Sequence, residues 1–314
     1  MRYAIVSVAL LLAGIVTPAA AQDCSLKQMA QLAISGLPRH VVVEVAVAGK
    51  PRHFLVDTGG LYSEIAAPIV EELGLRKTAV AMEIYGMDGQ QIKYGTTVPS
   101  LTIGNNELQN AHMLVMPGGQ GIDGILAPDI LQAFDVDFDM ASKMLRLFSP
   151  DHCPGKVVYW ATSYSTLPFK LADGFHITLP AEVDGHSLNT ILDSGSSENW
   201  MTQAAARQIY SLDETSPGMT KLDSTIGGMA VYRKTFQSFA LSDISVSYTT
   251  IFIRPPADMA TFQKNHSDKA AMDPIYGSWL DTPQLIVGMD VLHKLHVYIA
   301  YHEHTLYLTS ADGH

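Results

Sequence analysis

Apolar and polar residues alternate along most of the chain with the period of two that is typical of β-strands. The pattern is clearest in residues 40–49 and 176–185, where apolar side chains occupy every second position. A glycine then predicts a turn in each segment, and a second apolar run follows. Because Gly, Pro and Asn divide the rest into short segments of the same kind, the sequence predicts an all-β protein with a few short helices.

The chain contains an internal repeat. Residues 40–60 and 176–196 align without gaps at an offset of 136 residues, which superimposes Asp57 on Asp193. Since self-similarity over this length indicates duplicated units, we expect two β-rich lobes related by an approximate two-fold axis.

A second pair of matching segments closes each half. Residues 125–131 and 286–292 align at an offset of 161 residues, so the second half carries an insertion. We place most of it at about Pro256 to Trp279, as a surface excursion. The expected organisation is residues 1–21 as a signal peptide, 22–150 as an N-terminal lobe, 151–175 as the connection between the lobes and 176–314 as a C-terminal lobe.

The pattern predicts two short helices in each half. Pro68 suits a helix start, Gly74 suits a helix end, and Thr202 is a good N-cap residue. The connection also contains one strand-like run of apolar residues, Val157–Trp160. The expected helices are Ala67–Leu73, Asp129–Phe134, Ala204–Tyr210 and Asp290–Leu295.

The first residues have the layout of a secretory signal peptide. Arg2 precedes an apolar run, Thr17 and Pro18 interrupt it, and residues 19–21 offer an A-x-A cleavage site. The run is shorter than the roughly 20 residues that a membrane span needs. We therefore expect an exported protein, periplasmic or secreted, without a membrane span.

The composition and net charge of the chain limit the classes of molecule that it is expected to bind. Of 314 residues 47% are hydrophobic and 16% are charged, which is typical of a well-cored globular protein. With 20 Lys and Arg against 31 Asp and Glu, the net charge is −11. Since nucleic-acid binding depends on neutralising phosphates with Lys and Arg, a nucleic-acid partner is not expected.

The chain has two cysteines, Cys24 and Cys153. An even count in an exported protein favours a disulfide, although the sequence alone leaves two free thiols open. A bridge would close a loop of about 130 residues and stabilise the fold by at most roughly 4–5 kcal/mol in the chain-entropy model.

The repeat places the same chemistry in each half. Asp57-Thr58-Gly59 and Asp193-Ser194-Gly195 both follow an apolar strand. A carboxylate at the end of a buried strand is costly unless it accepts hydrogen bonds, and a tight glycine turn can direct main-chain N–H groups at it. Taken alone, Asp-Thr-Gly is a weak signal. Two copies at matching positions predict two carboxyl groups that face each other.

These motifs, with residues 286–292 (Ile-Val-Gly-Met-Asp-Val-Leu), resemble aspartic proteases of the pepsin and retropepsin type. The two-lobed chain is similar to pepsin, and the compact lobes resemble retropepsin subunits fused in tandem. The resemblance covers about Val41 to Leu308. It implies closed β-barrel lobes, an active cleft between them and Asp57 with Asp193 as the catalytic dyad.

The resemblance also implies the mechanism. Two carboxyl groups about 3 Å apart share one proton, so the ionised member activates a water molecule and the protonated member polarises the scissile carbonyl. The expected reaction is hydrolysis of a peptide bond in a peptide or protein substrate. This chemistry needs no metal and no cofactor, and we expect a monomer because one chain supplies both halves.

Two positions depart from the family pattern. Gly60 offers no hydroxyl where Ser196 does, and Ala127 stands where lobe two keeps Gly288. We hypothesise that the hydroxyl of Ser196 binds Asp193 and favours its ionised form, which leaves Asp57 as the partner that is more often protonated.

A hairpin is expected over the cleft. Residues 82–90 place strand-like flanks around Asp88 and Gly89, which is a strong two-residue hairpin signal. By resemblance, Tyr85 and Gly86 would lie near the substrate with them. The counterpart in lobe two, residues 225–229, has no aromatic side chain at its tip.

Two function classes remain at this point. The first is an exported aspartic endopeptidase. The second is a catalytically silent relative that binds peptides or a protein partner in the same cleft, which the departures at Gly60 and Ala127 keep open.

Overall fold

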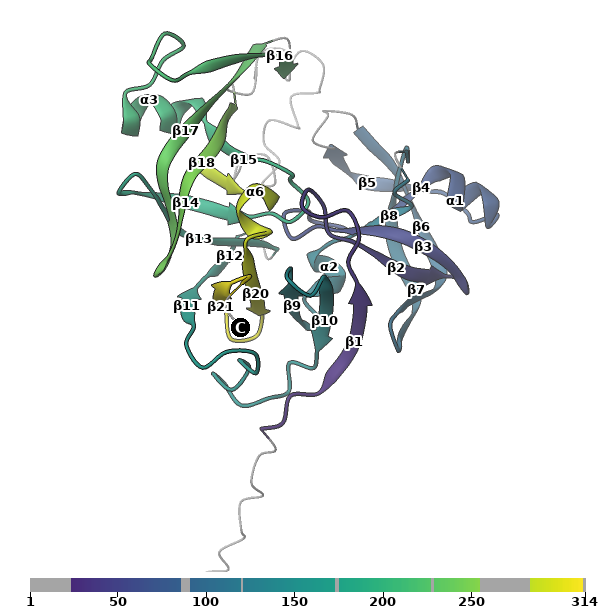
Figure 1. Ribbon diagram of the computed structural model, residues 1–314. Helices are drawn as coiled ribbons and strands as arrows, with labels where there is room; N and C mark the ends of the chain where they lie inside the picture. The colour runs from purple at the N-terminus through teal and green to yellow at the C-terminus, as the bar shows by residue number, and fades with distance from the viewer. Residues whose placement is uncertain are drawn as a thin grey trace, which may run out of the picture.

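The structure is a computed structural model that describes residues 24–85, 91–119, 121–172, 175–226, 229–254 and 283–312. It consists of two β-lobes with a third sheet between and below them (Figure 1). The expected signal peptide and the insertion at about Pro256 to Trp279 lie outside the described residues. No helix in the described part of the chain has the length and the apolar character needed to cross a membrane.

Lobe one is a closed barrel. Its strands follow the order β2-β3-β8-β4-β7-β6-β5, and an additional pairing of β2 with β6 closes the ring. Closure gives most edge strands a partner, as the resemblance implied. The elements are β2 (Val42–Val47), β3 (Lys50–Val56), β4 (Glu64–Ala66), α1 (Ala67–Glu72), β5 (Thr78–Tyr85), β6 (Gln91–Ile103), β7 (Asn106–Met116), β8 (Gly124–Leu126) and α2 (Pro128–Leu131).

Lobe two repeats this arrangement. Its order is β12-β13-β14-β19-β15-β18-β17-β16, and a pairing of β13 with β17 closes the ring. The elements are β12 (Lys170–Ala172), β13 (His176–Val183), β14 (His186–Leu192), β15 (Asn199–Thr202), α3 (Gln203–Tyr210), β16 (Thr220–Ile226), β17 (Met229–Leu241), β18 (Ile244–Arg254), β19 (Leu285–Val287) and α6 (Met289–Leu292).

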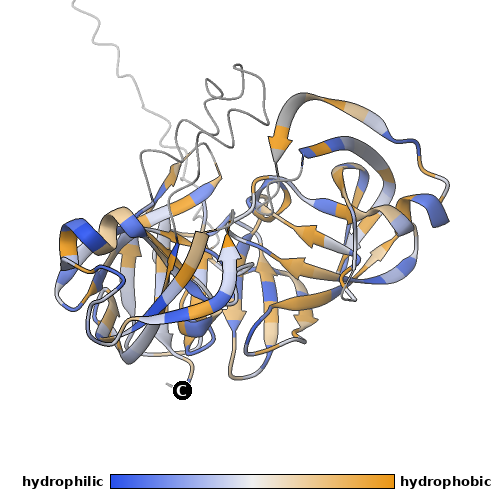
Figure 2. Cartoon of the chain, turned by 90° about the horizontal axis from the view of Figure 1, so that it is seen from above, coloured by the Kyte–Doolittle hydropathy of each residue, from blue (hydrophilic) through white to orange (hydrophobic). Residues whose placement is uncertain are grey.

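The alternating pattern sets which side chains fill each barrel. Val43, Val45 and Val47 are buried in β2, and the equivalent positions of β13, including Ile177 and Leu179, are buried as well. Viewed from above, the interior strands are largely hydrophobic, whereas polar residues are frequent on α1 and α3 at the outer ends of the lobes (Figure 2). The prediction of an all-β protein with two similar lobes is confirmed.

A six-stranded sheet connects the lobes. Its order is β1-β10-β9-β20-β21-β11, so β9 of the first half pairs directly with β20 of the second. This sheet also takes in the first described strand of the chain. Its strands are β1 (Gln28–Ala33), β9 (Asp135–Asp139), β10 (Met144–Phe148), β11 (Ser165–Pro168), β20 (Leu295–Ala300) and β21 (Thr305–Ser310).

The four expected helices are present, with slightly different bounds. Thr202 caps α3 as predicted, since its side chain accepts a hydrogen bond from the N–H of Ala205. The expected strand Val157–Trp160 is wrong, because these residues form no strand. They cross the six-stranded sheet and are held by side chains: Val157 is buried, and the hydroxyl of Tyr159 donates to Asp137 at 2.6 Å.

A buried network of charged groups lies under this crossing. Asp135 and Asp137 occupy alternate positions of β9 and are fully buried. His152 Nε2 lies 2.5 Å from Asp135 Oδ2, and His296 Nε2 lies 2.6 Å from Asp137 Oδ1. Arg146 of β10 also donates to Asp137. Burying a carboxylate costs free energy unless it has such partners. This network therefore holds the connection between the lobes against the sheet.

The sulfur atoms of Cys24 and Cys153 form a disulfide beside this network. Cys153 directly follows His152, so the bridge ties the start of the described chain to the same connection. The disulfide that the cysteine count favoured is therefore present in the structure.

We predict that His152→Leu lowers the free energy of unfolding by about 3–5 kcal/mol, because it leaves the carboxylate of Asp135 buried without its partner. Urea denaturation measures this change. His302→Leu, at an exposed histidine, is the matched control and should change stability by no more than about 0.5 kcal/mol. An equally small effect at His152 would contradict the assigned role.

The same pair gives stability a pH dependence. Burial alone lowers the pKa of His152, but its hydrogen bonds to Asp135 and to the carbonyl of Cys153, together with the charges of Asp135 and Glu303, outweigh burial and raise the pKa above 6.5. Burial raises the pKa of Asp135. Because both pKa values are higher in the folded chain, the folded state binds protons more tightly and stability falls as pH rises through each. In His152→Leu, the decline above neutral pH should be reduced.

Candidate active site

Two equivalent loops carry the predicted carboxyl groups. The N–H of Asp57 donates to Leu126 at the end of β8, and the N–H of Asp193 donates to Val287 at the end of β19, both at 2.9 Å. Each aspartate therefore starts its turn at the equivalent position of its barrel. Asp57 directly follows β3, and Asp193 directly follows β14. The repeat in the sequence therefore gives two loops with equivalent positions in their lobes.

Main-chain N–H groups hold each carboxyl group. Asp57 Oδ1 accepts from Gly59 and Gly60, each at 2.9 Å. Asp193 Oδ1 accepts from Gly195 at 2.9 Å and from Ser196 at 3.0 Å. These four hydrogen bonds fix the two carboxyl groups, which is the turn geometry that the sequence predicts.

Thr58 and Ser194 form a clamp between the lobes. The hydroxyl of Thr58 donates to the carbonyl of Leu192 at 2.9 Å and accepts from the N–H of Ser194 at 3.0 Å. In return, the hydroxyl of Ser194 donates to Val56 at 2.7 Å and accepts from the N–H of Thr58 at 3.1 Å. Both side chains are buried, so each loop is anchored in the opposite lobe.

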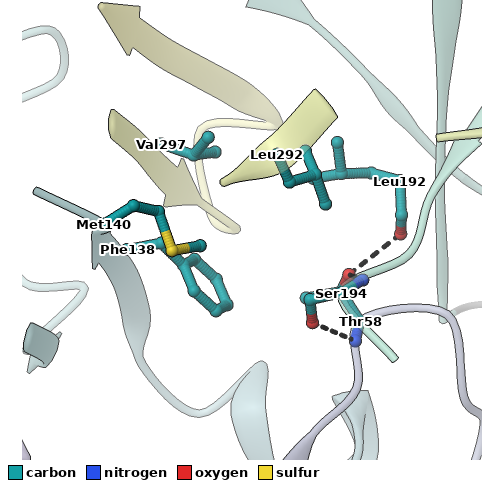
Figure 3. Close-up of a pocket in the computed structure, with 7 residues that line it drawn as sticks. All are labelled: Thr58, Phe138, Met140, Leu192, Ser194, Leu292 and Val297. Carbon is teal, nitrogen blue, oxygen red and sulfur yellow. Dashed lines mark hydrogen bonds between the residues drawn. The ribbon is translucent and has the colours of Figure 1, made fainter. Parts of the chain in front are cut away.

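The clamp rests on apolar side chains. Figure 3 shows Thr58 and Ser194 at one side of a small pocket whose remaining lining is hydrophobic. This pocket lies beneath the loops and contains no further polar side chain, so it supports the loops and is no candidate substrate site. The other lining residues are Phe138, Met140, Leu192, Leu292 and Val297.

The carboxyl groups of Asp57 and Asp193 contact each other through a hydrogen bond. A methyl group on Gly59 would overlap the carboxyl group of Asp193, and one on Gly195 would overlap that of Asp57. Glycine is therefore required at both positions for this approach.

Both carboxyl groups of this pair have raised pKa values. Burial raises the pKa of Asp57 and raises the pKa of Asp193 well above its ordinary value. The negative charge of Asp57 and the hydrogen bond to it raise the pKa of Asp193 further. Since two adjacent carboxylates repel each other, the two groups are harder to ionise together than one alone.

The hypothesis about Ser196 is wrong. Its hydroxyl donates to the carbonyl of Glu198 at 2.8 Å, and only its main-chain N–H reaches Asp193. That N–H does what the N–H of Gly60 does in lobe one. The missing hydroxyl at Gly60 therefore changes no contact with a carboxyl group.

The departures at Gly60 and Ala127 are related. A methyl group placed on Gly60 would lie 3.1 Å from Asp57 Oδ2 and 3.4 Å from the methyl group of Ala127, so these two positions are neighbours in lobe one. In lobe two a methyl group on Gly288 would lie 2.2 Å from the main-chain carbonyl oxygen of Glu198 and 2.6 Å from that of Ser196. Glycine is therefore required at position 288 by the main chain of the loop.

Matching side chains also support these two positions from below. Ser63 accepts from the N–H of Ala127 at 3.0 Å, and Asn199 accepts from the N–H of Gly288 at 2.9 Å. The support beneath the loop of lobe one is thus intact.

The predicted hairpin is described only in part. β5 and β6 pair through Ile84 with Ile92 and through Tyr85 with Gln91, as the strand-like flanks predict. Three of the expected substrate-binding residues, Gly86, Asp88 and Gly89, lie outside the described residues, as does the side chain of Tyr85. Lobe two has an equivalent hairpin of β16 and β17.

The sequence analysis did not identify His176 as a site residue. It is buried at the start of β13, and its Nε2 lies 2.9 Å from the carbonyl of Gly59 in the other lobe. The signal available in the sequence was its alignment with His40 at the start of the repeat. No cluster of possible metal ligands occurs in the described part of the chain.

Comparisons with known proteins agree with this geometry. Residues 43–130 match a family model described as Aspartyl protease, a span that includes Asp57. The structure matches the crystal structure of an aspartic proteinase from Irpex lacteus with a TM-score of 0.54 and 14% sequence identity, over 90% of this chain and 97% of that chain. No curated protein sequence matches.

We predict that Thr58→Val lowers the free energy of unfolding by about 2–4 kcal/mol, because it leaves the carbonyl of Leu192 and the N–H of Ser194 buried without partners. Ser194→Ala should have a similar effect for the equivalent reason. Thr178→Val, which removes a more exposed hydroxyl bond to a main-chain carbonyl, is the control, at about 0.5 kcal/mol or less. Chemical denaturation that gives equal values for all three variants would contradict the clamp.

Proposed function

We propose that this chain, which resembles aspartic proteases of the pepsin and retropepsin type, is an exported aspartic endopeptidase. The observation that carries the proposal is the pair Asp57 and Asp193, whose carboxyl groups lie against each other where the two lobes meet. The Aspartyl protease match in lobe one and the aspartic-proteinase fold of the whole chain support protease activity.

The proposed reaction uses the two aspartates in different roles. Ionised Asp57 acts as the general base that takes a proton from a water molecule, and protonated Asp193 polarises the scissile carbonyl. When the tetrahedral intermediate breaks down, the pair returns a proton to the leaving amine. The N–H groups of Gly59 and Gly60 stabilise the negative charge of Asp57 in this role.

Two features of the chain are compatible with export. The Cys24–Cys153 disulfide is compatible with an oxidising compartment, as is the signal-peptide pattern of residues 1–21. We propose peptide or protein substrates encountered there by a monomeric enzyme. Gly60 and Ala127 had kept a silent binding protein open, but both carboxyl groups receive the same main-chain donors, so these positions give no reason to prefer it.

We predict that the mature protein cleaves denatured casein and that Asp57→Asn and Asp193→Asn each reduce the rate by at least about 10³-fold, since each removes one half of the acid–base pair. Cleavage should be insensitive to chelators, because the two carboxyl groups activate the water. Asp184→Asn, at an aspartate outside the pair, controls for nonspecific effects. Folded protein that releases no peptides at any pH from acid to slightly alkaline would overturn the proposal.

The same pair sets the expected pH profile. Activity requires one proton on the pair, so it is lost at low pH when Asp57 is protonated and at high pH when Asp193 ionises. Because the pKa of Asp193 is raised well above its ordinary value, activity should persist to higher pH than an ordinary aspartic acid allows. Measurement of kcat/KM against pH should give a bell-shaped curve. A rate that still rises above neutral pH would contradict this assignment.

A further inference from the structure

His176 connects the two halves of the site. It is the first residue of β13 in lobe two, its side chain is buried, and its Nε2 lies 2.9 Å from the carbonyl oxygen of Gly59 in lobe one. Because a carbonyl can only accept, Nε2 carries the hydrogen and donates it. The imidazole is therefore either the neutral Nε2–H tautomer or the doubly protonated cation.

Gly59 contacts both carboxyl groups of the pair. Its N–H binds Asp57, and its Cα lies so close to the carboxyl group of Asp193 that no side chain fits. A displacement of Gly59 would change both contacts. A second contact across the lobes supports the same loop, since the rings of Phe175 and Tyr62 lie 5.6 Å apart.

The imidazole also acts by its charge. A protonated His176 lowers the pKa of Asp57, against the larger effect of burial. On the neighbouring strand β12, Ala172 pairs with His176, and Lys170 carries an exposed side chain.

We infer that His176 is a positioning residue of the carboxyl pair, which anchors Gly59 from the opposite lobe and makes Asp57 the charged partner. This inference rests on the proposed function, because it assigns the two aspartates their different roles. It also supplies the asymmetry that the sequence analysis had sought in Ser196.

His40 provides a matched comparison within the chain. It occupies the position of His176 in the repeat, but its ring makes no corresponding hydrogen bond to Gly195 among the described residues. Its buried Nδ1 has no hydrogen-bond partner there. The histidine contact therefore exists on one side only, at the loop that carries Asp57.

The test compares three variants of the mature protein. His176→Gln keeps an N–H donor for Gly59 and removes the charge, so the acid limb of kcat/KM should move to higher pH by up to about one pH unit with little change in KM. His176→Phe also removes the donor and should lower kcat as well. His40→Gln should match the wild type. Coincident profiles for wild type and His176→Gln would overturn the inference.

A second measurement does not depend on catalysis. A double-mutant cycle on stability combines His176→Gln with Asp57→Asn at mildly acid pH and at a pH low enough to protonate Asp57. The two effects on the unfolding equilibrium constant should deviate from additivity by at least about twofold at mildly acid pH, and less at low pH. Additive effects at both values would overturn the inference. Absence of casein cleavage by the wild type would instead overturn the proposed function and leave this cycle to decide the role of His176.

Discussion

The structure depends on holding two carboxyl groups against each other. Their mutual repulsion and their burial both oppose this arrangement. Four main-chain N–H groups offset part of that cost, two on each aspartate. Such donors are available only where the chain turns sharply after a buried strand, which is why each barrel ends in the same glycine loop.

The two barrels must also be fixed relative to each other, since a small displacement would separate the carboxyl groups. The clamp of Thr58 and Ser194 does this at the site itself through hydrogen bonds that cross between the lobes. Farther away, the six-stranded sheet and the network around Asp135 and Asp137 join the lobes over a larger area. The site is thus held by buried polar contacts supported on an apolar base.

The sequence predicted the parts that repeat. The alignment of Asp57 with Asp193 and the alternating strands depend on residues close together in the chain, and these predictions agree with the structure. Apart from the Asp57–Asp193 pair and the disulfide, contacts between residues distant in sequence could not be predicted. The contact of His152 with Asp135, and the side-chain anchors that replace the expected strand Val157–Trp160, arise only when the sheet forms. Likewise, the serine at position 196 suggested a hydroxyl group that donates to Asp193. The hydroxyl instead donates to the nearby carbonyl of Glu198, which the sequence does not reveal.

A duplicated fold presents a problem for acid–base chemistry, because equal halves cannot assign different roles to equivalent residues. The N–H donors do not resolve it, since each carboxyl group receives two at nearly the same distance. The clamp does not resolve it either, because Thr58 and Ser194 exchange equivalent bonds. The imidazole of His176 contacts the loop of Asp57, whereas His40 makes no matching contact. A side chain that lies outside both motifs can therefore break the symmetry while the geometry of the pair stays symmetric.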